Sequence, residues 1–158
     1  MTKYASCEKK NLHINQLREK GKYDTIKTLK LYVKGVVLME LLEELRELGV
    51  KVDEGLKRLG GNATIYKKML GTFVKMMKNY SCQPDFDAEE YEDIIEKAHA
   101  IKGASGNLSL TPIYEAYSEI VNLLRKQQPE QAREILIKVL PVQEKIISAI
   151  ENYMGNKQ

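Results

Sequence analysis

From Val36 to the end of the chain, apolar residues recur every three or four positions, and this spacing constrains the fold more than any other feature of the sequence. In the segment that ends at Gly49, the repeating residues are Leu38, Leu41, Leu42, Leu45 and Leu48. Such a repeat places one apolar stripe along an α-helix, whereas a half-buried strand would alternate apolar and polar residues. No later segment shows that alternation. The sequence therefore predicts an all-α protein from residue 36 onward.

Glycines, prolines and capping residues divide this helical region into segments with short connections. Gly49 ends the first segment, and a short helical turn is expected from Asp53 to Leu59, before Gly60 and Gly61. Four longer helices follow, with these expected limits: from Asn62, a favourable N-cap, toward Tyr80; from about Asp87 to Leu108; from Thr111, an N-cap, and Pro112 through Leu124; and from Gln128-Pro129 to near Met154-Gly155.

Long helices with short connections pack as antiparallel bundles. We therefore predict an antiparallel four-helix bundle with an additional helix or helices at its N-terminal end. Pro141 lies inside the last expected helix and is predicted to kink it, because proline lacks the backbone N–H and its ring clashes with the preceding turn.

Residues 1–35 are expected to form a basic leader, partly flexible or helical, before a bundle domain of residues 36–158. Residues 1–34 hold nine Lys or Arg and three acids, hence +6, and the remainder holds sixteen against nineteen, hence −3. A basic arm can bind nucleic acid. Apart from the adjacent Lys9 and Lys10, these lysines are scattered singly, without an arginine cluster or aromatic ladder, which favours a solvated leader and no nucleic-acid partner.

The structure expected at the end of this leader depends on how two overlapping patterns are weighed. Thr28 to Lys34 alternates like a strand, whereas Asp24 to Leu48 also fits one helix interrupted at Gly35. The helix is favoured because nothing later in the chain offers a strand partner.

Other features limit the class of protein. No run approaches the roughly 18 consecutive apolar residues of a membrane span. The start of the chain lacks the apolar stretch of a secretory signal, so a cytoplasmic location is expected. Cys7 and Cys82 have no metal-type spacing and are interpreted as free thiols, with a buried packing role as the alternative for Cys82.

One expected helix carries a histidine away from its apolar stripe. At about 100° per residue the stripe comprises Ile94, Ala98, Ile101, Ser105 and Leu108. His99 points roughly 140° from the middle of that stripe. Its neighbours on the helix surface are Ile95, Lys102, Gly103 and Gly106.

The two glycines beside His99 call for an explanation, because each costs about 1 kcal/mol relative to alanine inside a helix. Without a Cβ beside the imidazole, another macromolecule can bring its own reactive group close to it. The alternative is a solvated histidine with no role, which leaves the grouping of His99, Lys102 and the glycines unexplained.

The residue types at this face suit phosphoryl chemistry. A neutral imidazole is a nitrogen nucleophile toward an activated phosphoryl group. Lys102, one helical turn away, can offset the charge of phosphoryl oxygens, although an ordinary solvated lysine is the alternative. The sequence has no Gly-rich phosphate loop and no Walker-type Gly-Lys-Ser/Thr, so phosphorylation from ATP is not expected.

The run His99-Ala100-Ile101-Lys102-Gly103-Ala104-Ser105-Gly106-Asn107-Leu108 resembles the signature of histidine-containing phosphotransfer domains, His-x-Leu-Lys-Gly followed by small residues. The stretch from Val52 to Asn62, with Tyr66, Leu70 and Phe73 after it, is similar to the family's lead-in to the helix before the histidine helix. The similarity covers roughly residues 38–153. At position 109 the family usually has a glycine, whereas this chain has a serine. The difference affects only the local bend that follows the helix.

The resemblance implies a phosphocarrier without ATP-dependent kinase activity. His99 would accept a phosphoryl group from the aspartate of a receiver domain and pass it to another receiver aspartate. The implied partners are the receiver domain of a response regulator and a hybrid histidine kinase. Mg²⁺ is expected only in the receiver, with no cofactor or metal on this chain, and a monomer is expected.

The resemblance also implies site residues beyond His99 and Lys102. Ile95, Gly103 and Gly106 would form the docking surface, and Arg125 on the next helix would be a second cation near the site. Two other functions stay open on the residues alone. One is a helical adaptor that binds receivers without accepting phosphate, and the other is a helical protein that binds nucleic acid through the leader.

Overall fold

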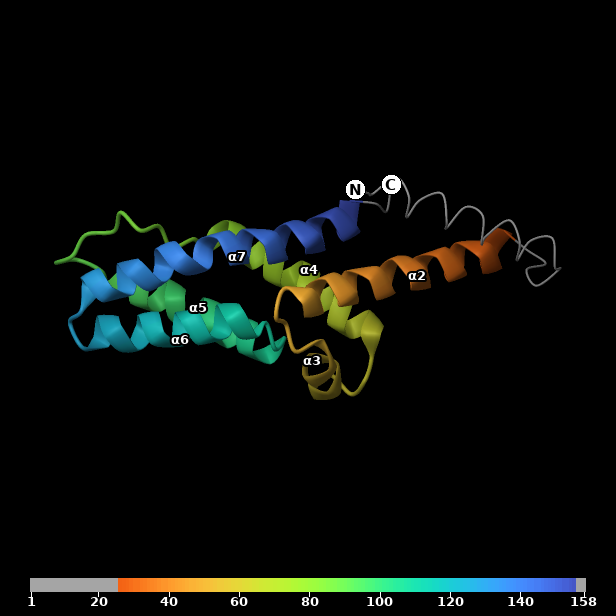
Figure 1. The fold of residues 1–158 in the computed structure, drawn as a ribbon, viewed down its shortest axis with the longest axis horizontal. Coiled ribbons are helices and arrows are strands. Elements are labelled where there is room, and N and C mark those ends of the chain that lie inside the picture. Colours follow the sequence, from red (N-terminus) through yellow and green to blue (C-terminus); the bar gives the residue numbers. More distant parts are fainter. Residues whose placement is uncertain (1–25, 156–158) are drawn as a thin grey trace. The chain divides into compact units, whose positions relative to one another are not determined.

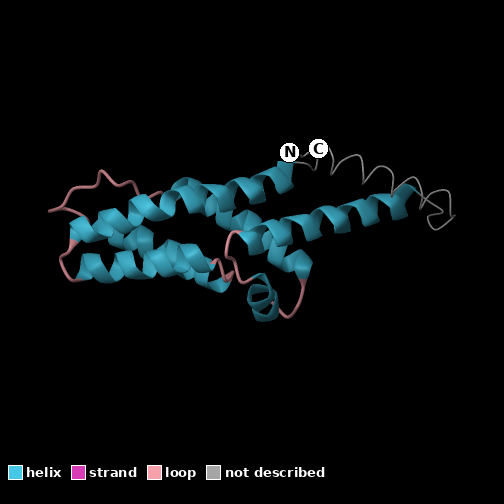
Figure 2. Cartoon of the chain, in the orientation of Figure 1, coloured by secondary structure: helices cyan, strands magenta, loops and turns pink. Residues whose placement is uncertain are grey.

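The described part of the chain, residues 26–155 of a computed structural model, contains helices and no strand (Figures 1 and 2). The elements are α2 (Ile26–Glu47), α3 (Val52–Arg58), α4 (Ala63–Asn79), α5 (Glu92–Asn107), α6 (Thr111–Arg125) and α7 (Pro129–Gly155). The all-α prediction is confirmed. The chain divides into two compact units, residues 1–39 and 40–158, and the division falls inside α2.

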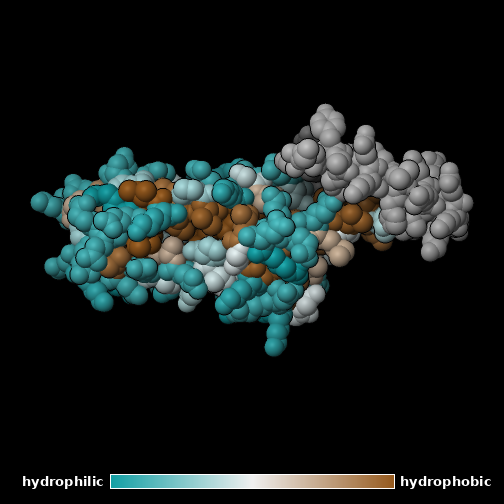
Figure 3. Space-filling view, viewed as in Figure 1, coloured by the Kyte–Doolittle hydropathy of each residue, from teal (hydrophilic) through white to brown (hydrophobic). Residues whose placement is uncertain are grey.

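Within residues 40–158, helices α4 to α7 form a four-helix bundle, as predicted. Helix α5 packs along α6, α6 packs along α7, and α4 contacts both α7 and α5, which closes the ring (Figure 1). The connections of three residues at 108–110 and 126–128 make successive helices antiparallel. The space-filling view shows a mostly hydrophilic bundle surface with hydrophobic residues along its middle (Figure 3).

The predicted apolar stripes supply the core. The largest fully buried side chains are Tyr66, Tyr117, Phe73, Leu45, Leu70, Ile101, Leu108, Leu110, Ile113, Ile120, Leu124 and Leu136. The expected ends of several helices are also confirmed. Gly49, with φ of +85°, follows the end of α2, and the Asn62 side chain accepts hydrogen bonds from the backbone N–H groups of Thr64 and Ile65 at the start of α4.

The helix that carries His99 begins at Glu92, so the predicted start near Asp87 is wrong. The Asp87 carboxylate accepts a hydrogen bond from the Glu89 backbone N–H at 2.8 Å, a local turn that competes with the helix. Arg133 of α7 donates to two backbone carbonyls of this segment, one of them that of Phe86 at 2.9 Å. Contacts with another helix therefore hold residues before Glu92 as a loop.

Two further local predictions, one inside α2 and one at the start of α6, are also wrong. Helix α2 runs through Gly35 without interruption, because a single glycine costs only about 1 kcal/mol inside a helix. This continuous helix also excludes the strand alternative for residues 28–34. Leu110, not Thr111, is the N-cap of α6, and the Thr111 hydroxyl donates instead to the Ser109 carbonyl at 3.2 Å.

Of three remaining predictions, the structure decides one, and the other two stay predictions. Helix α7 continues through Pro141 as one element, and the kink there stays a prediction. Cys82 is a free thiol and is buried, as in the packing alternative. Cys7 and most of the expected leader, which includes His13, lie outside the described residues.

Candidate functional site

Helix α5 presents two opposite faces, as the sequence predicts. All five residues of its apolar stripe are buried: Ile94, Ala98, Ile101, Ser105 and Leu108. His99 is exposed, so its imidazole is accessible to a second macromolecule. Glu92 and Asp93 lie in the first turn, where carboxylates interact favourably with the positive end of the helix dipole.

The end of α5 is held by contacts from three other parts of the chain. The Tyr66 hydroxyl of α4 donates to the Leu108 carbonyl at 3.0 Å, and burial raises the pKa of that tyrosine to about 12. The Lys51 backbone N–H, just before α3, donates to the Ser109 carbonyl at 3.1 Å. The Leu110 backbone N–H donates back to the Ser105 carbonyl at 2.9 Å. These bonds fix the direction in which the helix presents His99.

Two lysines of α5 flank His99 in sequence, and they occupy different surroundings. Lys97 pairs with Asp93 at 2.8 Å, a contact that lowers the pKa of Asp93 and raises the pKa of Lys97. Lys97 therefore already has an acidic partner on its own side of the helix. Lys102 is half-buried and lies one turn after His99, on the histidine face. Of the two lysines of α5, Lys102 is therefore the one on the histidine face.

The two glycines near His99 differ in their surroundings. A Cβ at position 103 would meet nothing within 4 Å, so the helix backbone there is open to solvent. A Cβ at position 106 would lie 3.0 Å from Cδ2 of Tyr114, because the ring of that tyrosine covers Gly106. The open approach expected from both glycines is therefore present at Gly103, whereas at Gly106 a side chain of the same protein occupies the space.

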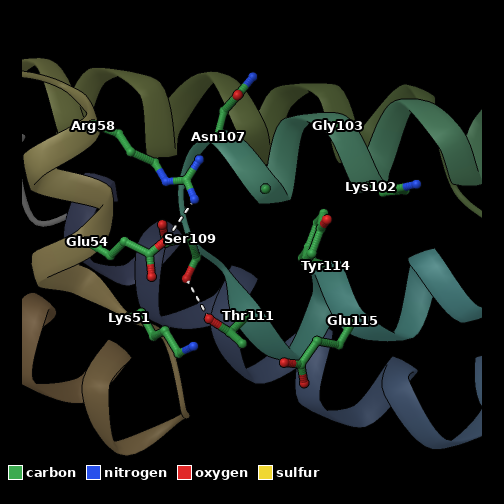
Figure 4. A pocket seen from close by; sticks show the side chains of 11 residues that line it. Lys51, Glu54, Arg58, Lys102, Gly103, Asn107, Ser109, Thr111, Tyr114 and Glu115 are labelled. Carbon is green, nitrogen blue, oxygen red and sulfur yellow. Dashed lines mark hydrogen bonds and ion pairs between the residues drawn. The ribbon is translucent and has the colours of Figure 1, made fainter.

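A pocket of about 350 Å³ adjoins the histidine face between α3, the end of α5 and the start of α6 (Figure 4). Its lining residues are Lys51, Glu54, Arg58, Lys102, Gly103, Gly106, Asn107, Ser109, Thr111, Tyr114 and Glu115. Arg58 donates to Glu54 at 2.6 Å, an exposed pair that lowers the pKa of the Glu54 carboxyl. Three of the predicted site residues, Lys102, Gly103 and Gly106, line this pocket, and His99 lies one turn outside it.

The other two predicted site residues lie toward the opposite end of α5. Ile95 is half-buried one turn before His99. Arg125 is exposed in the last turn of α6. At about 1.5 Å per residue in two antiparallel helices, Arg125 lies roughly 9 Å farther from the connecting turn than His99 does. The fold thus places Arg125 near the level of the first turn of α5.

Sequence reasoning missed the part of this surface that α3 and α6 contribute. Tyr114, Glu54 and Arg58 are separated by many residues from His99 and reach its neighbourhood only through the packing of the chain. The helical period of α6 does distinguish Tyr114, because the period assigns Ile113 and Tyr117 to the buried side and leaves Tyr114 outside. The helical period therefore predicts that Tyr114 is exposed, but it does not predict that the ring lies against Gly106.

No group of three or more His, Cys, Asp or Glu side chains within residues 26–155 is arranged to hold a metal ion. In that same part of the chain, every helix is too short or too polar to cross a membrane.

Comparison with known proteins gives one match. A family model described as Hpt domain matches residues 36–153, well over half of the chain. The searches of curated proteins and of solved structures returned no match. The matched region contains the whole four-helix bundle except the last residues of α7, together with His99 and every residue that lines the pocket. The chain therefore belongs to the family of Hpt domains, helical bundles with a phosphotransfer role in phosphorelays.

Proposed function

We propose that His99 accepts a phosphoryl group from the aspartate of a receiver domain and passes it to the aspartate of another receiver. The observation that carries this proposal is the exposed imidazole of His99 beside the open backbone at Gly103. The helix has a fully buried stripe behind it, so the histidine is held on a rigid support and faces outward. A partner can therefore bring its own reactive group to the imidazole without moving a side chain at position 103.

The transfer requires little from this chain beyond a placed nucleophile and a cation. The lone pair of the unprotonated imidazole nitrogen attacks phosphorus, a new N–P bond forms, and the O–P bond to the aspartyl oxygen breaks. The electron pair of that bond leaves with the aspartate carboxylate. In the reverse step a receiver carboxylate attacks the same phosphorus and the N–P electron pair returns to the ring.

Lys102 would stabilise the charge on the phosphoryl oxygens from one turn away. We assign the Mg²⁺ of the reaction to the receiver domain, and we assign this chain the role of a carrier with no ATP-dependent kinase activity. Ile95 and Gly103 would contact the receiver directly, and Gly106 would lie beneath the Tyr114 ring at the same surface. Arg125 would contact the edge of the receiver near the start of α5.

The proposal is tested by the variant His99→Gln with a receiver domain charged by a ³²P-labelled phosphodonor. Label that is acid-labile and base-stable should appear on the parent chain and be absent from the variant. Circular dichroism should show the same helical content in both, because an exposed ring contributes little to the core. His13→Gln is the matched control and should take up label like the parent.

Transfer to His99→Gln at the parent rate would refute the assignment. Binding of the receiver without label on the parent chain would instead identify an adaptor.

Two variants separate the charge of Lys102 from the shape of its side chain. Lys102→Ala should slow transfer about tenfold, because the cation is lost, and Lys102→Arg should retain most of the rate. An alanine variant as fast as the parent would leave Lys102 as a surface charge only.

A further inference from the structure

Tyr114 lies against a glycine backbone instead of in the bundle core. It belongs to the first turns of α6, and a Cβ at Gly106 would lie 3.0 Å from its Cδ2 and 3.1 Å from its Cε2. Even so, 41% of its surface is exposed, whereas Tyr117, three residues later, is fully buried. Gly106 thus lets an aromatic ring approach the histidine helix closely while much of the ring faces solvent.

The ring forms one wall of the pocket beside the histidine face, and Figure 4 shows it rising from α6 toward α5 between Lys102 and Asn107. Glu54 and Arg58 of α3 stand across the pocket. The lining carries both signs of charge: Lys51, Arg58 and Lys102 are cations, and Glu54 and Glu115 are anions. These three cations and two anions leave a formal net charge of only +1, so the pocket does not select strongly for either sign of charge, and an uncharged polar group would find hydrogen-bond donors and acceptors in it.

The size of a protein–protein contact places this pocket within reach of any partner that docks on His99. A transient interface buries about 600 Å² per partner, which corresponds to a disc of radius roughly 14 Å. Gly106 is seven residues after His99, roughly 10 Å along the helix. A partner centred on the imidazole therefore covers Gly106, and with it the ring of Tyr114 and the mouth of the pocket.

We propose that Tyr114 and this pocket are a specificity-determining part of the receiver-binding surface, and that the pocket takes an uncharged polar side chain from a loop of the receiver. The proposal rests on the proposed function and extends the contact surface from α5 to α3 and α6. Rigid aromatic rings contribute large contact area at low conformational cost, which is why tyrosine is enriched among the residues that dominate binding energies.

The test compares two phosphoryl donors with the same set of variants. One donor is a receiver domain charged with acetyl phosphate and selected because it transfers to the parent chain. The other is phosphoramidate, which needs no docking surface: its P–N bond breaks, the new N–P bond to His99 forms, and ammonia leaves. The test variants are Tyr114→Ala and Tyr114→Phe. The control is Ile137→Ala, which truncates a large exposed side chain on α7.

For Tyr114→Ala we expect the KM for the charged receiver to rise about tenfold with kcat nearly unchanged. Phosphoramidate should label the variant at the parent rate. Tyr114→Phe and Ile137→Ala should behave like the parent with both donors, because the first retains the ring and the second lies outside the proposed surface.

Each other outcome is decisive. An unchanged KM in Tyr114→Ala overturns the inference while leaving the proposed function intact. Slower labelling of Tyr114→Ala by phosphoramidate, or an equal rise of KM in Ile137→Ala, also overturns it, because either would show a general disturbance of the fold. A parent chain that takes no label from any charged receiver overturns the proposed function itself.

Discussion

Gly103 and Gly55 both lie inside helices, and the structure gives a different physical reason for the presence of glycine at each position. At Gly103 a Cβ would meet nothing, so the position leaves space for a partner. At Gly55 of α3 a Cβ would lie 2.7 Å from the Leu108 carbonyl oxygen and 2.8 Å from Cε2 of Tyr66. Gly55 therefore permits a close approach inside the protein, between α3, α4 and the end of α5.

These surroundings predict opposite effects on stability. Gly103→Ala should raise the free energy of unfolding by about 0.5–1 kcal/mol, because alanine has the higher helix propensity and no contact opposes it. Gly55→Ala should lower it by about 1–3 kcal/mol, because the new methyl group collides with a backbone oxygen and a buried ring. Urea denaturation of both variants measures the two changes.

The bulkier Gly103→Gln should also slow transfer from a charged receiver without lowering stability, since it fills the space beside His99. A Gly103→Gln variant that lost stability and transfer together would show that position 103 is needed for packing within the bundle.

At the scale of elements, the turn between α5 and α6 is where the chain departs from the usual residue of its family. Ser109 has φ of +53°, a left-handed conformation that L-residues adopt at a cost of roughly 1–2 kcal/mol. Its side chain is buried, and its hydroxyl has no hydrogen-bond partner. Its carbonyl nevertheless accepts from Lys51 and Thr111, so the strained residue joins the start of α3 to the start of α6.

Ser109→Gly should therefore stabilise the protein by about 0.5–1 kcal/mol, since glycine adopts the left-handed conformation freely and removes the unpaired hydroxyl. The midpoint of thermal unfolding should rise, and phosphoramidate, which needs no docking surface, should label the variant at the parent rate because the histidine face ends before this turn. Gln127→Gly is a companion variant at the other left-handed residue, with φ of +59°, and should stabilise by a smaller amount because that side chain is exposed. A lower midpoint for Ser109→Gly would mean that the serine makes contacts that outweigh its strain.

At the scale of the whole molecule, the core contains ionisable groups that are held neutral. Burial raises the pKa of the Cys82 thiol from its ordinary 9.0 to about 11, and burial likewise raises the pKa values of Tyr66 and Tyr117. The folded state therefore keeps these protons at a pH where the unfolded chain loses them. The resulting stabilisation is complete below the pKa of the unfolded thiol and is lost as the pH rises from about 9 toward 11.

Stability should accordingly fall between pH 8 and pH 10, and Cys82→Ala should show a shallower fall. The expected difference between parent and variant is about 1 kcal/mol over this interval. Urea denaturation at pH 8, 9 and 10 measures both curves, and comparing slopes removes the constant cost of the smaller side chain. Parallel curves for the two proteins would show that the thiol does not contribute to the alkaline loss.

The sequence by itself determined the helices and the orientation of the histidine, because both depend on local periodicity. The stripe of α5 is buried and His99 is exposed, as the 3.6-residue repeat requires, and Asn62 caps α4 as its side chain predicts. The four-helix bundle follows from long amphipathic helices with short connections. The signature around His99 was sufficient to predict the family.

The tertiary structure alone decided the outcome where local sequence signals compete. It also decided which residues distant in sequence come into contact. Arg133 of α7 holds the loop before Glu92, so the start of α5 depends on a contact between residues 47 positions apart in sequence. Tyr114 covers Gly106 and leaves Gly103 open, although the two glycines look equivalent on a helical wheel. Helical periodicity assigns a side chain to the inside or the outside of an element, but it carries no information about which element lies opposite. The pocket beside His99 was therefore beyond sequence reasoning, because packing alone brings α3 and α6 to it.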